Sequence, residues 1–212
     1  IARVRVELGN QSKGASGGGG GGAIRVGTTM RFHAPGGRLE RSAMTSYVYD
    51  EDGRVVEKVT AGSRWRYEWT VEGQLAAVVR PDGQRWTYEY DAFGRRVRKS
   101  GPGPGGEVEY VWDGAVIAQE FREGEEPATW VYEQETFRPL AKVQGGVAYS
   151  VVTDAIGTPR ELVTGDGELA WAAKFRAFGD VERVAVKQTD CPIRFQGQWL
   201  DEESGLAYNW HR

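Results

Sequence analysis

The sequence predicts an all-β protein in which consecutive antiparallel hairpins form a twisted, curved sheet. Its 212 residues include 30 glycines, 8 tryptophans, 9 tyrosines and 7 phenylalanines, a composition that favours strands and turns. Aromatic residues also recur at a nearly constant spacing, and several segments alternate aromatic with charged side chains. No long segment shows the 3.6-residue period of an amphipathic helix.

The first element, residues 1–13, alternates charged and aliphatic side chains and is interpreted as one strand. Residues 14–22 are almost entirely glycine, which gives the backbone great conformational freedom. We therefore predict that residues 1–30 comprise an N-terminal strand and a flexible linker.

Residues 31–145 are predicted to be a repeat region. Aromatic residues that end a strand and begin a turn are spaced 20, 21, 22 and 20 residues apart, at Tyr49, Trp69, Tyr90, Trp112 and Tyr132. Such spacing is the signature of a repeat architecture. Further turns are expected between the units, at residues 80–83, 102–105 and 123–127.

Three of the repeats share a turn of the form aromatic, polar, two free positions, glycine and a long polar residue. An aspartate at the first turn position can accept backbone N–H bonds, and the glycine can adopt a positive φ. A type I turn that ends in a glycine bulge needs both features, so each unit is predicted to be a hairpin. The predicted turn residues are Tyr49, Asp50, Gly53 and Arg54, then Trp69 and Gly73, then Tyr90, Asp91, Gly94 and Arg95.

Alternation predicts which side chains share a face of the sheet. Trp65, Tyr67 and Trp69 have one parity, and the charged residues between them have the other. Stacked aromatic rows would stabilise neighbouring strands by ~0.2–1 kcal/mol per cross-strand pair. If the rows were exposed, they could instead bind sugars, so a carbohydrate-binding or adhesive module is the alternative function.

Residues 146–212 follow a different pattern. Residues 147–152 read as a strand, and the next turn contains Asp154, Gly157 and Pro159. The last block mixes aromatic residues with a turn at residues 201–205.

The three consecutive acids in that last turn, Asp201, Glu202 and Glu203, could be a carboxylate pair for glycoside hydrolysis. Adjacent positions in a turn seldom face each other, and turns favour polar residues. A solvated turn is the preferred interpretation.

Other reactive residues have similarly ordinary interpretations. Cys191 with His211 lacks a third, orienting group, which favours a buried or incidental thiol. His33 is interpreted as a turn residue, and residues 101–106 as a surface turn, because a phosphate-binding loop needs a Lys-Ser/Thr ending and a following helix.

Composition excludes several classes of site and partner. The net charge of −3 provides no cationic field for nucleic acid. One cysteine and two histidines cannot build a disulfide framework or a histidine-rich metal centre. No run approaches the ~20 apolar residues of a membrane span, and no signal peptide is visible. No catalytic, cofactor-binding or metal-binding residue is expected.

The quoted blocks resemble a known family. The Tyr-Asp-x-x-Gly-Arg units at residues 49–54 and 90–95 resemble the YD repeats of Rhs (rearrangement hotspot) proteins. Residues 132–141, 153–160 and 194–209 resemble, in that order, the Rhs-associated core, with Trp199 and Ser204 in place of the usual tyrosine and threonine. The residues of the core motif are Arg194, Phe195, Gly197, Gln198, Asp201, Gly205, Leu206, Tyr208 and Asn209.

This resemblance implies a structural function. Family members wind antiparallel sheets into a shell, or cocoon, that encloses a C-terminal toxin, and the core helps to close one end. Such proteins are polymorphic toxins or type VI secretion effectors that are secreted or delivered to a target cell in bacterial competition. The expected partners are the rest of the shell, the enclosed toxin domain, and secretion-apparatus or chaperone proteins. The resemblance places the self-cleavage aspartates and the toxin beyond Arg212, so this chain is expected not to be an enzyme.

Overall fold

A computed structural model describes residues 23–26, 29–34, 36–175 and 181–211. Within these ranges every regular element is a β-strand, and no helix that could cross a membrane occurs. The prediction of an all-β fold made of consecutive antiparallel hairpins is confirmed. The chain divides into two compact units, one ending at Arg85 and one beginning at Trp86.

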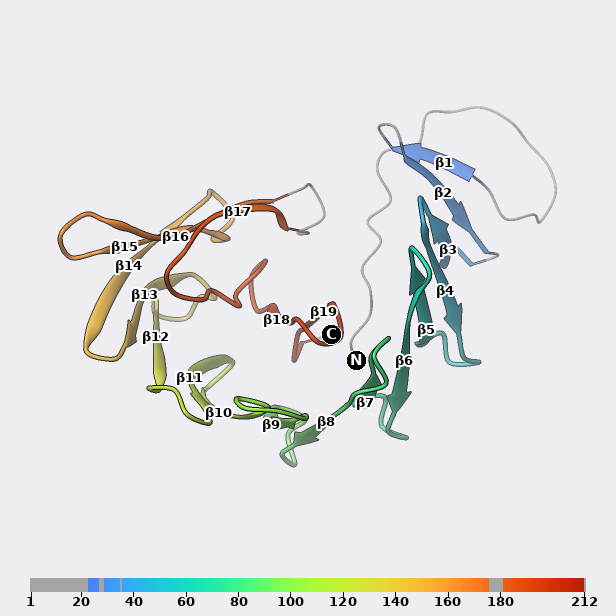
Figure 1. Cartoon of the computed structure of the whole chain (residues 1–212), viewed down its shortest axis with the longest axis horizontal. Helices are drawn as coiled ribbons and strands as arrows, with labels where there is room; N and C mark the ends of the chain where they lie inside the picture. The colour runs from blue at the N-terminus through green and yellow to red at the C-terminus, as the bar shows by residue number, and fades with distance from the viewer. Residues whose placement is uncertain (1–22, 27–28, 35, 176–180, 212) are drawn as a thin grey trace. The chain divides into compact units, whose positions relative to one another are not determined.

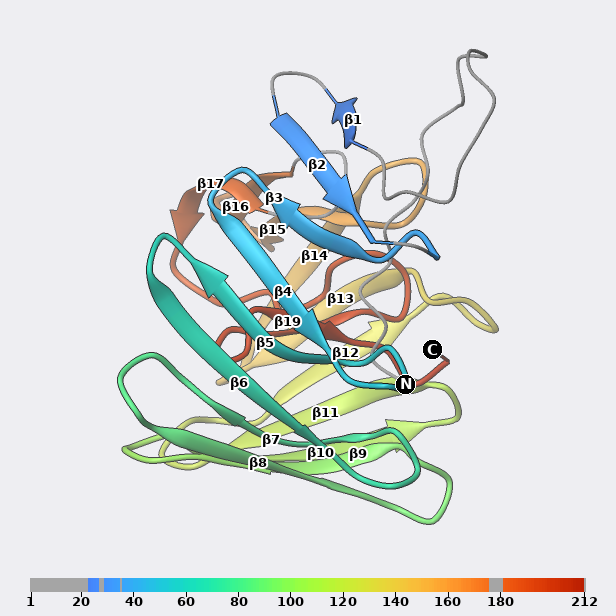
Figure 2. The same cartoon turned by 90° about the vertical axis from the view of Figure 1, so that its right-hand side faces the viewer.

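The N-terminal unit is a meander in which each strand pairs antiparallel with the next (Figure 2). Its strands are β1 (Ala23–Val26), β2 (Thr29–His33), β3 (Leu39–Ser42), β4 (Thr45–Tyr49), β5 (Val55–Thr60), β6 (Ser63–Trp69) and β7 (Leu75–Val79). The predicted strand at residues 1–13 and the glycine run at residues 14–22 lie outside the described residues. β1 and the start of β2 fall within the segment 1–30 that was predicted to be strand and linker.

The two faces of the N-terminal sheet differ as the alternation predicts. In β6, Tyr67 is buried and its two aromatic neighbours of the same parity are half-buried, whereas Arg64 is exposed. The exposed face carries cross-strand ion pairs, such as Arg64 Nη1 to Glu57 Oε2 at 2.7 Å. One face is therefore apolar and the other is charged.

The C-terminal unit is also an antiparallel meander, accompanied by a small second sheet. Its main strands are β8 (Arg85–Tyr90), which begins at the unit boundary, β9 (Arg96–Ser100), β10 (Glu107–Asp113), β11 (Val116–Arg122), β12 (Ala128–Tyr132), β13 (Pro139–Gln144), β14 (Val147–Thr153), β15 (Pro159–Thr164), β16 (Leu169–Phe175) and β17 (Val181–Lys187). Consecutive strands from β8 to β17 pair antiparallel. The second sheet is a hairpin of β18 (Trp199–Asp201) and β19 (Leu206–Tyr208).

The core of the C-terminal unit lies between these two sheets. The sheet from β9 to β17 is curved, and the β18–β19 hairpin lies on its concave side (Figure 1). The curved sheet of β9 to β17 is called the wall below. Its core residues include Val108, Trp130 and Leu162, and the hairpin contributes Trp199 and Tyr208. The wall of this unit is thus folded around the polypeptide that follows it.

Candidate functional site: repeat turns and a buried charge cluster

The glycines of the predicted turns lie where the chain reverses direction. Gly53, Gly73, Gly94 and Gly157 have φ values of +79°, +81°, +79° and +82°. The N–H of each glycine donates to the carbonyl three residues earlier, at 2.9–3.0 Å. In each of these hairpins the strand register shifts at the residue before the turn, so that a bulge completes the turn.

The aspartates hold these turns together with two kinds of bond. Asp50 Oδ1 accepts the backbone N–H of Arg54 at 2.8 Å, and Oδ2 accepts its Nε at 2.6 Å. Asp91 binds Arg95 in the same way, at 2.9 and 2.7 Å. Although burial would raise the pKa of Asp91, the N–H and guanidinium of Arg95 lower it overall.

The turn after β14 is a variant of this arrangement. Asp154 accepts the backbone N–H of Thr158 at 2.9 Å, and its other oxygen pairs with the Arg160 guanidinium at 2.7 Å. Pro159 is the buried first residue of β15, opposite Thr153. The aspartate therefore keeps its role although its cation has moved along the chain.

The strand-end aromatic residues have a role that the spacing does not reveal. Four of them use the polar atom of the side chain to donate a hydrogen bond to a backbone carbonyl at or near the start of the preceding strand. The bonds are Tyr49 Oη to Leu39 O at 2.7 Å, Trp69 Nε1 to Val55 O at 2.8 Å, Trp112 Nε1 to Arg96 O at 2.7 Å and Tyr132 Oη to Ile117 O at 3.2 Å. The repeat aromatic thus clamps its hairpin to the preceding one.

Four rings at the centre of the aromatic rows are buried and so provide no exposed binding platform. Tyr67, Tyr88, Tyr110 and Trp130 are 3%, 6%, 4% and 2% exposed. A ring must present an open face to stack on a sugar, and these rings are covered. Their burial argues against the carbohydrate-binding alternative.

The interpretation of residues 201–203 as a solvated turn is wrong for two of the three acids. Asp201 is 1% exposed and Glu203 5% exposed, whereas Glu202 points to solvent. Both buried carboxylates meet cations on β9, a strand about a hundred residues earlier in sequence. The turn is polar because it completes a buried ion cluster.

Arg96 is the centre of this cluster. Its Nη1 donates to Asp201 Oδ2, and its guanidinium carbon lies 4.3 Å from the ring centroid of Tyr88 and 4.2 Å from that of Tyr208. Burial alone would lower the pKa of Arg96, but Asp201 and the surrounding tyrosines hold it well above its usual value. The guanidinium therefore stays charged in an aromatic enclosure.

Lys99 and Glu203 form the second half of the cluster. Lys99 Nζ lies 3.1 Å from Glu203 Oε2 and 3.4 Å from Asp201 Oδ1. The hydroxyl of Tyr88 donates to Glu203 Oε1 at 2.9 Å. Burial, with the two nearby carboxylates, raises the pKa of Tyr88 far above that of a free phenol.

Aromatic contacts dock the same hairpin beside the ion cluster. The Trp199 ring meets Tyr110 at 5.9 Å and Trp130 at 6.1 Å, both edge to face. Tyr208 meets Trp112 in the same manner at 6.1 Å, and its hydroxyl oxygen accepts the backbone N–H of Arg96 at 2.9 Å. The hairpin is thus held by both ion pairs and rings.

The other core-motif residues shape the segment around this hairpin. Arg194 is buried and donates from Nη1 to the carbonyls of Cys191 and Ile193 at 2.7 and 2.9 Å. Gly205 N donates to Asp201 O at 2.8 Å, and Leu206 pairs with Asp201 across the hairpin.

The remaining motif residues form the tight bend before β18 and the exit after β19. The N–H of Gln198 donates to Phe195 O at 2.9 Å, and Gly197 between them has φ +69°. After β19, the side-chain oxygen of Asn209 accepts the N–H of His211 at 3.0 Å.

Another buried cation fixes the start of this segment, and no sequence pattern indicated it. Lys142 Nζ donates to Thr189 Oγ1 at 2.7 Å and to the Asp190 carbonyl at 2.8 Å. Burial lowers the pKa of Lys142 and raises that of the buried Glu120, which pairs with Arg122 at 2.6 Å.

The other residues considered in the sequence have structural positions. Cys191 is buried, which confirms the interpretation as a buried thiol, and burial raises its pKa to about 12. His33 ends β2, and its Nδ1 lies 3.1 Å from the carbonyl oxygen of Gly37 in the following turn. Residues 101–106 connect β9 to β10 as a turn.

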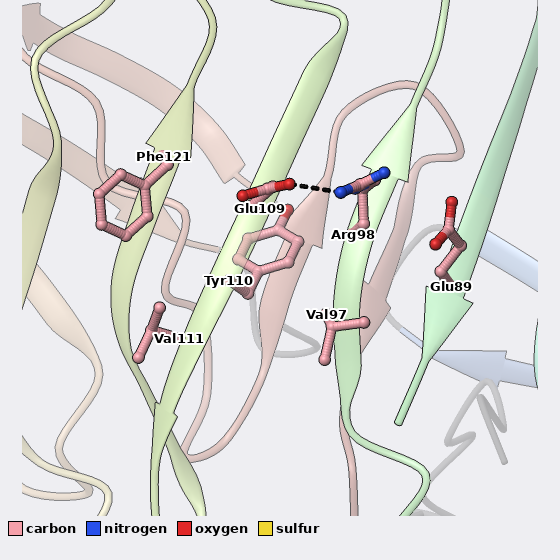
Figure 3. A pocket seen from close by; sticks show the side chains of 7 residues that line it. All are labelled: Glu89, Val97, Arg98, Glu109, Tyr110, Val111 and Phe121. Atoms are coloured by element: carbon pink, nitrogen blue, oxygen red, sulfur yellow. Dashed lines mark hydrogen bonds and ion pairs between the residues drawn. The ribbon is translucent and has the colours of Figure 1, made fainter. Parts of the chain in front are cut away.

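The convex face of β8 to β11 carries a recess of about 330 Å³ (Figure 3). Val97, Val111 and Phe121 contribute apolar surface, and Arg98 Nη2 donates to Glu109 Oε1 at 2.6 Å. The charged pair resembles the ion pairs on the exposed face of the N-terminal sheet, as expected for a surface in contact with solvent.

Comparison with known proteins agrees with this architecture. The family profile described as Teneurin YD-shell matches residues 25–212. "Probable deoxyribonuclease RhsA" of Dickeya dadantii (strain 3937) is 37% identical over 189 residues, 83% of this chain and 13% of RhsA. "Double-stranded DNA deaminase toxin A" of Burkholderia cenocepacia (strain H111) is 29% identical over 217 residues, 86% of this chain and 15% of that toxin.

A solved structure shows the same fold. The structure described as "Crystal Structure of TcdB2-TccC3-TEV" superposes with a TM-score of 0.54 at 15% identity, over 85% of this chain and 10% of the solved one. The chain thus spans only a small part of the proteins that it matches. It belongs to the Teneurin YD-shell family and is an Rhs/YD-repeat protein.

Proposed function

We propose that the chain is a wall segment of an Rhs-type shell that encloses a C-terminal toxin domain and helps to deliver it. The observation that carries the proposal is the arrangement of the C-terminal unit. One face of its sheet is exposed to solvent, and the other curves around the β18–β19 hairpin that follows it in sequence. Buried ion pairs and aromatic contacts hold this hairpin against the sheet. A curved sheet that binds the following segment of its own chain on its concave side is suited to enclosing polypeptide.

The segments of the chain have different roles in this proposal. Residues 31–145 form the repeat wall, and residues 146–212 begin the core block that helps to close the shell. The strand-end aromatic clamps and the Asp-Arg turns give the wall its stability, and no residue is assigned a catalytic role. The partners are the rest of the shell, the enclosed domain and the secretion or chaperone proteins that handle it.

The toxin names of the relatives support this proposal. RhsA is named as a probable deoxyribonuclease, and the Burkholderia cenocepacia relative as a DNA deaminase toxin. Two such different activities beside one similar segment fit a shared container with variable contents. Delivery to a target cell is part of the proposal.

Protease protection in the full-length parent protein tests the enclosure. We expect the C-terminal domain of the wild type to resist a protease that digests the same domain expressed alone. A variant whose wall is opened, Trp130→Asp, should lose this resistance, whereas Phe93→Ala on the exposed turn should keep it. Equal digestion of the domain in the wild type and in isolation would overturn the proposal.

A further inference from the structure

We propose that docking of the β18–β19 hairpin on the wall is sensitive to acid: the hairpin leaves the concave face when Asp201 and Glu203 are protonated. This acid-sensitive docking extends the proposed shell function, and its biological role rests on that proposed function. The docking itself can be measured without reference to any toxin.

The ion cluster joins the hairpin to the wall by opposite charges on two separate elements. Both cations, Arg96 and Lys99, belong to β9, and both carboxylates belong to the hairpin. The four side chains are only 1–6% exposed. Their charges sum to zero, so the cluster is compatible with burial only while both carboxyls are ionised.

The backbone does little to hold the hairpin on the wall. In the described residues, β18 pairs with β19 and, through isolated contacts, with residues 192 and 193 of the same C-terminal segment. No ladder joins the hairpin to the strands β8 to β17 within that part of the chain. Docking therefore depends on side chains, and the ion pairs can be lost without breaking the wall.

The tyrosines that face the cluster do not change charge in acid. The phenols of Tyr88 and Tyr110 have pKa values raised by burial, and burial likewise raises the pKa of Tyr208 to about 12. Tyr90 Oη accepts from Arg96 Nη2 at 3.3 Å and is a phenol as well.

One further acid lies nearby. On β11, Glu120 faces Lys99 and pairs with Arg122, and its pKa is raised by burial. Its protonation would remove another negative charge from the same interior. Acid thus leaves Arg96 and Lys99 cationic, buried and without counter-charge, and opening the hairpin lets water reach them.

Variants that imitate protonation test the proposal at neutral pH. In the full chain, Asp201→Asn with Glu203→Gln should increase amide exchange in β18 and β19 on the order of 100-fold, because removing one side of a buried pair strands the other. Exchange in β12 and β13 should stay unchanged. Glu202→Gln, which alters the exposed acid between them, is the matched control and should exchange like the wild type.

A rescue separates stranded charge from lost packing. Adding Arg96→Met and Lys99→Met to the double variant removes the stranded cations and should restore slow exchange in the hairpin. The proposal would be overturned if the hairpin of the double variant exchanged as slowly as that of the wild type. It would also be overturned if the quadruple variant failed to restore slow exchange.

A titration of the wild type covers the case in which the variants fail to fold. Exchange rates normalised to an unstructured peptide should show the hairpin losing protection before β12 and β13 as the pH is lowered from about 7 to about 2. Simultaneous loss in both regions would overturn the acid-sensitive docking. Enclosure of a toxin is measured separately, by protease protection at neutral pH. The enclosure proposal and the acid-sensitive docking proposal can therefore fail independently.

Discussion

Replacing Trp199 with alanine tests whether the C-terminal hairpin is a structural part of the wall. Trp199 is 4% exposed, and its ring edges meet Tyr110 at 5.9 Å and Trp130 at 6.1 Å. Truncation removes the indole from the centre of the core and leaves a cavity between the hairpin and the wall. The change should loosen the hairpin and lower the stability of the C-terminal unit.

The size of the effect follows from the burial. An aromatic side chain buries ~150–250 Å², which at ~25 cal/mol per Å² corresponds to ~4–6 kcal/mol as an upper bound. Truncating a buried tryptophan to alanine typically costs ~3–5 kcal/mol. We therefore expect a loss of about 4 kcal/mol. For a chain of this length, ~2–4 °C per kcal/mol gives a decrease in Tm of about 8–16 °C.

Thermal unfolding followed by circular dichroism measures this loss. Trp199→Tyr keeps an aromatic ring between Tyr110 and Trp130 and should lose less than half as much stability. Phe93→Ala truncates an aromatic residue that is 75% exposed in the same unit, and should cost less than about 1 kcal/mol. A Trp199→Ala variant no less stable than Phe93→Ala would refute the reasoning.

Four further predictions concern the turns, the clamps and the buried thiol. Gly157→Ala should cost ~1–2 kcal/mol because alanine is strained at φ +82°, whereas Gly165→Ala, at an open site where the backbone has no positive φ, should be nearly neutral; Tm values compare the two. Tyr132→Phe removes the clamp to a backbone carbonyl and should cost about 1 kcal/mol in a denaturant titration, and an unchanged midpoint would contradict the clamp. Asp91 has a folded pKa below its ordinary 3.8, so it contributes stability above about pH 4 that is lost as the pH falls through the folded pKa; the Tm of Asp91→Asn should vary less with pH in this range than that of the wild type. Cys191, with a pKa of about 12, should resist alkylation by iodoacetamide at about pH 8 until denaturant is added, and rapid labelling of the native chain would contradict its burial.

The hairpin architecture could be predicted from the sequence because its determinants are local. An aspartate such as Asp50 and the glycine three residues later, Gly53, lie within one turn, and their bonds reach only to Arg54. The period-two alternation of β6 likewise assigns its faces without knowledge of other strands. Features that depend on a few neighbouring residues are therefore visible in the sequence.

The clamps were only partly visible. The spacing identified Trp112 and Tyr132 as strand-end residues, but not the carbonyls that accept their hydrogen bonds. Those acceptors, on Arg96 and Ile117, belong to the preceding strand, and the register between the two paired strands determines which carbonyl lies within reach.

The buried ion cluster shows why part of the candidate site could not be predicted. Asp201 and Glu203 have the composition of a solvated turn, and only the distant strand β9 determines that they are buried. Strict alternation would place Arg96 and Lys99 on opposite faces of β9. The register shifts beside the β8–β9 turn: Tyr90 pairs with Arg96, but Glu89 pairs with Arg98. This extra residue in β9 brings both cations to the concave face. The bulge that closes a repeat turn therefore also supplies the two charges that receive the hairpin, and neither function can be changed at this turn without affecting the other.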